Sequence, residues 1–154
     1  MSRAFVKEPD GGTPEALPER PISPHPNLVT REGLAAMEAE LARLDAAHAA
    51  AVRADDRPAI AATQRDQRYW TARRASAQLV ETPAATDRVQ FGSTVTIERD
   101  DGRKQTFRIV GEDEADPAQG TLSHVSPLAR ALFGKAVGDV AEAAGGEVEI
   151  LRIN

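Results

Sequence analysis

The chain has 154 residues, with 19 Lys or Arg against 24 Asp or Glu and a formal net charge of −5. This length suits one medium-sized domain or two small ones and excludes a large, multi-lobed enzyme. The absence of Cys excludes disulfides, thiol nucleophiles and Cys-ligated metal sites. No apolar run reaches the roughly 18–20 residues of a membrane span and no apolar signal core is present, so we expect a soluble cytoplasmic protein without membrane contacts.

The charge is unevenly spread along the chain. Residues 1–27 carry a net charge of −1, residues 28–81 are neutral, and residues 82–154 carry −4. Because no region has a basic excess, specific binding to duplex DNA is not expected.

Residues 1–27 are predicted to form an extended, Pro-rich N-terminal arm. Six prolines lie within the first 26 residues. Each proline removes a backbone donor and biases the preceding residue away from the helical conformation. We therefore expect no independent core in this segment.

Residues 28–81 are predicted to form an antiparallel coiled-coil hairpin. After Thr30, a plausible N-cap, apolar or tolerated residues recur at heptad spacing: Leu34, Met37, Leu41, Leu44, His48 and Ala51. The pattern breaks at 54–58, the expected tip, and a second helix is predicted from Ala59 to Val80. A connection of about five residues requires the two helices to run antiparallel. The 23 residues from Arg31 to Arg53 would give an arm of about 35 Å.

The two predicted helices carry opposite charge. Residues 31–56 hold six acidic and three basic residues, whereas residues 57–74 hold one Asp and five Arg. We interpret the arginines as a basic face that pairs with the acidic helix; a contact with acidic channel walls or RNA is the alternative. They are Arg57, Arg65, Arg68, Arg73 and Arg74. Opposite charges on the two arms disfavour a parallel homodimer, so a monomer is expected.

Residues 82–154 are predicted to fold as an antiparallel sheet with one short helix. Strands are expected at 94–98, 105–110, 121–125, 137–140 and 147–153, with a hairpin turn at Asp100-Asp101-Gly102. Ser126 and Pro127 open a helix over Leu128–Phe133, and Gly134 ends it. The overall fold class is therefore α+β.

Several segments resemble the bacterial GreA/GreB transcript cleavage factors. They are Asn27–Gly33, Ser76–Glu81, Val89–Val95, Phe107–Glu112 and, most specifically, Ser126-Pro-Leu-Ala-Arg-Ala-Leu-Phe-Gly-Lys-Ala-Val-Gly-Asp139. The resemblance covers about residues 27–154. It implies an FKBP-like C-terminal domain that docks at the RNA polymerase secondary channel, with Ser126, Pro127, Leu128 and Arg130 as candidate docking residues.

The resemblance also implies that a hairpin tip carries acidic residues to the polymerase active centre, where they help to hold a second Mg²⁺. Carboxylates suit this role because Mg²⁺ prefers oxygen ligands and two ions steady the attacking and leaving oxygens. Here the tip candidates are Asp55 and Asp56, as weak Mg²⁺ ligands within the complex only. The chain itself is expected to be a binding factor and not an enzyme, with no cofactor of its own.

The tip departs from the family pattern. The family's acidic loop motif is absent, and the hairpin is roughly ten residues shorter, which removes about 7–8 Å from each arm. Since catalytic placement tolerates errors nearer ~1 Å, Asp55 and Asp56 do not simply inherit the catalytic role. A plain N-cap is the alternative role for this pair. The short hairpin is similar to the Rnk branch of the family.

The sequence is compatible with three classes of function. The favoured one is a polymerase-binding regulator of elongation without full cleavage-stimulating activity, and its variant is a genuine cleavage stimulator acting through Asp55 and Asp56. A second class is a prolyl isomerase, disfavoured because Phe91, Phe107 and Phe133 are all interpreted as core residues and no aromatic-lined pocket is indicated. The third is an Rnk-like module with a partner other than polymerase.

Overall fold

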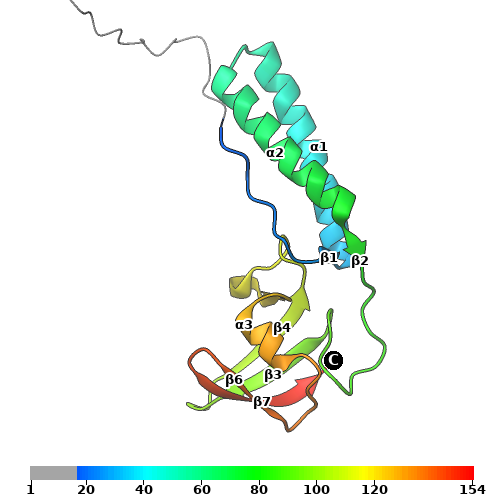
Figure 1. Ribbon diagram of the computed structural model, residues 1–154, viewed down its shortest axis with the longest axis vertical. Helices are drawn as coiled ribbons and strands as arrows, with labels where there is room; N and C mark the ends of the chain where they lie inside the picture. The colour runs from blue at the N-terminus through cyan, green and yellow to red at the C-terminus, as the bar shows by residue number, and fades with distance from the viewer. Residues whose placement is uncertain (1–16) are drawn as a thin grey trace, which may run out of the picture.

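A computed structural model describes residues 17–154, in which a helical hairpin stands on a small β-sheet domain (Figure 1). The first 16 residues of the predicted arm lie outside the described range. Residues 17–26 are extended and run beside the hairpin to its base. No helix within residues 17–154 is long and apolar enough to cross a membrane.

The hairpin consists of α1 (Arg31–Arg53) and α2 (Arg57–Ser76). Thr30 caps α1, because its side chain accepts a hydrogen bond from the Gly33 amide. The buried seam of α1 is narrow: Met37, Leu44 and Ala51 are buried at intervals of seven residues, as a coiled-coil stripe requires. Polar pairs complete the contact between the helices, including the 3.0 Å bond between His48 Nδ1 and Thr63 Oγ1.

The base of the hairpin is closed by a two-stranded parallel sheet that the sequence did not predict. β1 (Leu28–Val29) pairs with β2 (Gln78–Leu79) where the chain enters and leaves the hairpin. The predicted extension of the second helix to Val80 is therefore wrong. α2 ends at Ser76, and the extended backbone of Ala77 leads into β2.

The C-terminal domain is built on a five-stranded sheet in the order β5-β4-β3-β7-β6. Its strands are β3 (Thr94–Arg99), β4 (Lys104–Val110), β5 (Thr121–Ser123), β6 (Val140–Ala143) and β7 (Gly146–Ile153). The prediction of an antiparallel sheet is correct for three of the four pairings. It is wrong for β5, which runs parallel to β4, because the connection 111–120 crosses back over the sheet end and includes the 3₁₀-helix η1 (Pro117–Gln119).

One short helix, α3 (Pro127–Leu132), packs on the inner face of this sheet. Ser126 caps it by accepting from the Ala129 amide at 3.3 Å, and Pro127 occupies the first turn, as predicted. The helix inserts Ala129 and Leu132, both fully buried, into an apolar core. The other core residues are Val89, Phe91, Val95, Ile97, Phe107, Ile109, Leu122, Ala141, Val148, Ile150 and Ile153.

The predicted strand at 137–140 is a turn for most of its length. Gly138 adopts φ 90°, and Asp139 closes the turn by accepting from the Ala136 amide at 2.9 Å. Only Val140 joins a strand, at the start of β6. A glycine with positive φ ends extended structure, which is why the alternation of residues was misleading here.

Candidate functional site

The hairpin tip is a tight turn formed by Ala54, Asp55 and Asp56. The Asp56 amide donates to Ala51 O at 3.0 Å and the Asp55 amide donates to Val52 O at 3.1 Å, the two bonds of a Schellman motif. Asp55 takes the left-handed position of this motif, with φ 51°. Glycine usually occupies that position, and Asp is among the few other residues that tolerate it.

The two tip aspartates differ in structural role: Asp55 occupies the left-handed position of the turn, and Asp56 caps α2. Asp56 is the N-cap of α2, and its Oδ1 accepts from the Ala59 amide at 3.2 Å. Both aspartates are exposed. Within residues 17–154 no cluster of three or more His, Asp or Glu is arranged to hold a metal ion.

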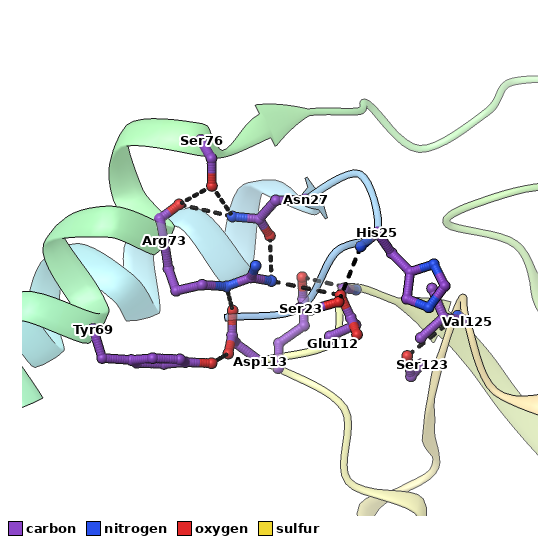
Figure 2. Close-up of polar contacts among 12 residues, drawn as sticks. Ser23, His25, Asn27, Tyr69, Arg73, Ser76, Glu112, Asp113, Ser123 and Val125 are labelled. Atoms are coloured by element: carbon purple, nitrogen blue, oxygen red, sulfur yellow. Dashed lines mark hydrogen bonds and ion pairs between the residues drawn. The ribbon is translucent and has the colours of Figure 1, made fainter. Parts of the chain in front are cut away.

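At the other end of the hairpin, Arg73 of α2 joins the hairpin to the C-terminal domain (Figure 2). Its side chain is 2% exposed, and its Nε donates to Asp113 Oδ2 at 2.6 Å. Its Nη2 donates to Asn27 Oδ1 at 2.8 Å and lies 3.7 Å from Glu112 Oε2. The Tyr69 hydroxyl donates to the other oxygen of Asp113. We call this cluster of Asn27, Tyr69, Arg73, Glu112 and Asp113 the joint.

Asn27 ties the chain entry to the exit of α2. Its Nδ2 donates to Arg73 O at 2.7 Å and to Ser76 Oγ at 3.1 Å. A single buried amide side chain therefore joins the residue that precedes β1 to the last turn of α2. Because buried polar groups are costly when unpaired, this arrangement is specific as well as stabilising.

Glu114 forms a second bridge between the domain and the hairpin. Its carboxylate accepts from the Thr30 amide at 3.0 Å, from the Thr30 hydroxyl and from the Gly111 amide at 3.2 Å. The same carboxylate lies over Gly33, where an added Cβ would come within 2.1 Å of Glu114 Oε2. A side chain at position 33 would therefore have to displace the Glu114 carboxylate from its hydrogen bonds to Thr30 and Gly111.

Burial raises the pKa of Tyr69 to about 12, and the hydrogen bond to Asp113 acts in the same direction. Both effects favour the neutral phenol, which donates to the carboxylate.

The predicted basic face of the hairpin is only partly present. Arg73 does not belong to it, because it is buried in the joint and paired with the domain. Arg74 pairs with Glu38 of α1 at 3.1 Å, Arg65 with Asp66 at 3.0 Å, and Arg68 with Glu19 at 2.7 Å. Arg57 is exposed in the first turn of α2.

The candidate docking residues of the C-terminal domain lie on and around α3. Ser126 is engaged as its cap, and Leu128 is half-buried against the domain core. Pro127 and Arg130 are exposed, and Arg130 Nη2 lies 3.5 Å from His25 Nε2 of the arm. Pro127 and Arg130 are therefore the members of this set that offer surface to a partner.

Comparison with known proteins places the C-terminal domain in a family. Residues 84–154 match the family model described as "Transcription elongation factor, GreA/GreB, C-term". Residues 84–154 are therefore a GreA/GreB C-terminal domain. The resemblance predicted from the sequence is thereby confirmed.

Curated GreA/GreB relatives match the same part of the chain. Transcription elongation factor GreB of Neisseria meningitidis is 51% identical over 74 residues, covering 47% of this chain and 45% of the relative. Transcription elongation factor GreA of Anaeromyxobacter sp. is 48% identical over 85 residues, covering 53% and 49%. The chain spans about half the length of the curated relatives it matches.

Among solved structures, GreA factor homolog 1 (Gfh1) of Thermus thermophilus has a TM-score of 0.41 at 18% identity, covering 84% of this chain and 99% of that one. A GreA/GreB factor from Nitrosomonas europaea has a TM-score of 0.39 at 20% identity, covering 83% and 98%.

Sequence patterns did not predict the joint, although two of its five residues, Asn27 and Glu112, lie in segments that carry the GreA/GreB resemblance. The residues that meet Glu114 in the second bridge, Thr30, Gly33 and Gly111, also lie in these segments. The sequence feature nearest to the joint was the acidic run Glu112-Asp113-Glu114, which begins two residues after the predicted strand 105–110.

The buried position of Arg73 predicts a large loss of stability when its guanidinium is removed. In Arg73→Met the carboxylate of Asp113, 10% exposed, loses its cation, and the free energy of unfolding should fall by about 3–5 kcal/mol. Urea unfolding followed by circular dichroism measures this. The matched control is Arg74→Met, which removes only the exposed pair with Glu38 and should cost less than ~1 kcal/mol. Equal losses in the two variants would contradict the assignment of the joint.

The raised pKa of Tyr69 predicts a loss of stability at high pH. An unfolded tyrosine titrates near ~10, so the neutral phenol stabilises the fold below that pH, and this contribution disappears as the pH rises from about 10 towards 12. Tyr69 is the only Tyr in the chain, so absorbance at the tyrosinate band follows this one group. The expected midpoint lies near 12 in the folded protein; a midpoint at the ordinary value would show that the hydroxyl is not held by Asp113.

Proposed function

We propose that this chain binds RNA polymerase through its GreA/GreB C-terminal domain and places the short hairpin in the secondary channel, where it regulates elongation. The observation that carries the proposal is the match of residues 84–154 to the C-terminal domain of factors named transcription elongation factors. The chain acts in this proposal as a binding factor for another enzyme's active centre and performs no chemistry itself.

The joint supports insertion of the hairpin into the channel, because it fixes the hairpin relative to the C-terminal domain. Arg73 and Glu114 fasten the hairpin base to the loop that follows β4, so a partner that holds the domain also sets the direction of the helices. A helix of 23 residues then carries the tip about 35 Å from its base. Exposed Pro127 and Arg130 supply the docking surface in this proposal.

The tip supports regulation without full cleavage stimulation. Asp56 already serves as an N-cap, which leaves the exposed carboxylate of Asp55 as the principal oxygen donor for an ion. A single exposed carboxylate holds Mg²⁺ weakly, since the ion keeps most of its waters unless several oxygens converge on it. A hairpin shorter than that of the cleavage factors acts in the same direction, because positioning errors of about 1 Å already slow a reaction strongly.

Docking through α3 predicts a charge-sensitive association. Arg130→Glu should weaken binding to core RNA polymerase about tenfold, the loss expected for one well-placed interface cation. Fluorescence anisotropy of the labelled chain at low salt measures this. Arg152→Glu is the matched control, because Arg152 is exposed on β7, and it should bind as the unaltered chain does. If the unaltered chain does not bind polymerase, the proposal fails, and a partner of another kind, as for an Rnk-like module, becomes the better hypothesis.

The tip assignment is tested in a stalled, backtracked polymerase complex with Mg²⁺. Asn tolerates the left-handed conformation and also caps helices, so Asp55→Asn and Asp56→Asn remove charge while keeping the turn. With the unaltered chain present, we expect polymerase to release 3′ RNA fragments at close to the rate of polymerase alone. We expect the same rate with either variant. Prompt release that disappears in Asp55→Asn would instead establish the chain as a cleavage stimulator.

A further inference from the structure

The arm residues 17–26 lie along α2 and end at the joint (Figure 1). This segment includes Pro18, Pro21, Pro24 and Pro26, which keep it extended. Its lower end is fixed where Asn27 enters the joint. Higher up, Glu19 and Arg20 bind side chains of α2.

Arg20 makes the central contact of the arm. Its guanidinium carbon lies 3.9 Å from the centre of the Tyr69 ring and 5.8 Å from that of Trp70. Its Nη1 also lies 3.4 Å from Asp66 Oδ1. A planar guanidinium suits this geometry, because it stacks on an aromatic face while one edge meets a carboxylate.

The ring under Arg20 is the one whose hydroxyl reaches the C-terminal domain. Tyr69 donates to Asp113, the carboxylate that also receives Arg73. Of the two arm residues that bind α2, Arg20 thus contacts the joint through the Tyr69 ring, whereas Glu19 pairs with the neighbouring Arg68. Trp70 packs against the same ring edge-to-face, with centroids 5.2 Å apart.

The contact between hairpin and domain is polar and incompletely filled. A cleft of about 200 Å³ opens between them, lined by residues of both parts, including Gly33, Met37, Trp70, Asp113 and Glu114. The apolar core belongs to the domain, with Leu28 and Val80 of the hairpin base packing only at its margin. Contacts of this kind permit relative motion unless further interactions restrain them.

We propose that Glu19 and Arg20 act as a latch that restrains the angle between the hairpin and the C-terminal domain. Arg20 holds Tyr69 on Asp113, and Glu19 keeps the arm on α2 through Arg68. Tyr69 and Arg20 are positioning residues in this device. The latch is made of partly exposed ion pairs, with Arg68 and Glu19 53% and 63% exposed, so salt or a competing charged surface opens it. Release of the arm leaves the orientation of the hairpin to the joint and Glu114 alone, and so widens the range of angles that the hairpin samples.

The test measures the angle directly and uses no polymerase, so its result is independent of the proposed function. Because the chain has no Cys, Val52→Cys near the tip and Glu142→Cys on β6 accept spin labels selectively; both sites are exposed. Double electron–electron resonance then gives the distribution of distances between the two spin labels, one on the hairpin and one on the domain. At low salt we expect one narrow distribution, which broadens in Arg20→Ala at least twofold in width.

Graded and control variants separate a latch from a general loss of structure. Arg20→Lys should broaden the distribution less than Arg20→Ala, because an ammonium retains the charge but not the planar stacking. Arg103→Ala removes a comparable exposed pair in the β3–β4 turn, with Asp101 at 2.6 Å, and should leave the distance distribution unchanged.

If circular dichroism shows that Arg20→Ala does not fold, two other experiments test the latch: Glu19→Arg, and a salt titration of the unaltered chain. Both should broaden the distance distribution. An unchanged width of the distance distribution in Arg20→Ala overturns the latch. If that variant does not fold, an unchanged width in both Glu19→Arg and the salt titration overturns it.

Discussion

The interaction on which this structure depends most is the ion pair between Arg73 and Asp113. Burying a guanidinium removes it from water at a cost that only close, well-oriented partners offset. Here the partners come from separate parts of the chain: Asp113 and Glu112 follow a strand of the domain, and Asn27 precedes the hairpin. A hairpin turned to another angle would leave these charges unpaired. The pair therefore selects one orientation of hairpin and domain over the alternatives.

The two parts of the molecule differ in how they are stabilised, and this difference fits their proposed roles. The domain has its own apolar core, in which α3 packs Ala129 and Leu132 against the sheet. The hairpin buries a thin line of three seam residues in α1 and, of the residues in α2, only Arg73. Helices with so little apolar contact depend on tertiary support. A domain with its own core can bind a partner, and a thin hairpin supported by that domain can enter a narrow channel in the partner.

Local patterns in the sequence predicted most of the elements, and the failures have physical causes. Heptad spacing identified α1, and the Ser126-Pro127 cap identified α3, because each depends on neighbours within one or two turns. The parallel pairing of β5 and the β1–β2 pair depend on where distant segments meet, which periodicity does not encode. Arg73 was assigned to a basic face because its spacing matches that of other arginines; its burial is caused by carboxylates 39 and 40 positions away in the chain. For the tip, the sequence indicated both the cap and the acidic pair, but the division of duties between Asp55 and Asp56 required the backbone geometry.

In the proposed function, the domain anchors the chain while the joint directs a short hairpin towards the polymerase active centre. An electron cryomicroscopy structure of the full chain bound to backtracked RNA polymerase tests this most directly, through the position of the tip. We expect the C-terminal domain at the rim of the secondary channel, the joint intact, and the tip inside the channel but short of the catalytic Mg²⁺. A domain bound elsewhere, or an Asp55 carboxylate coordinated to that ion, would contradict it.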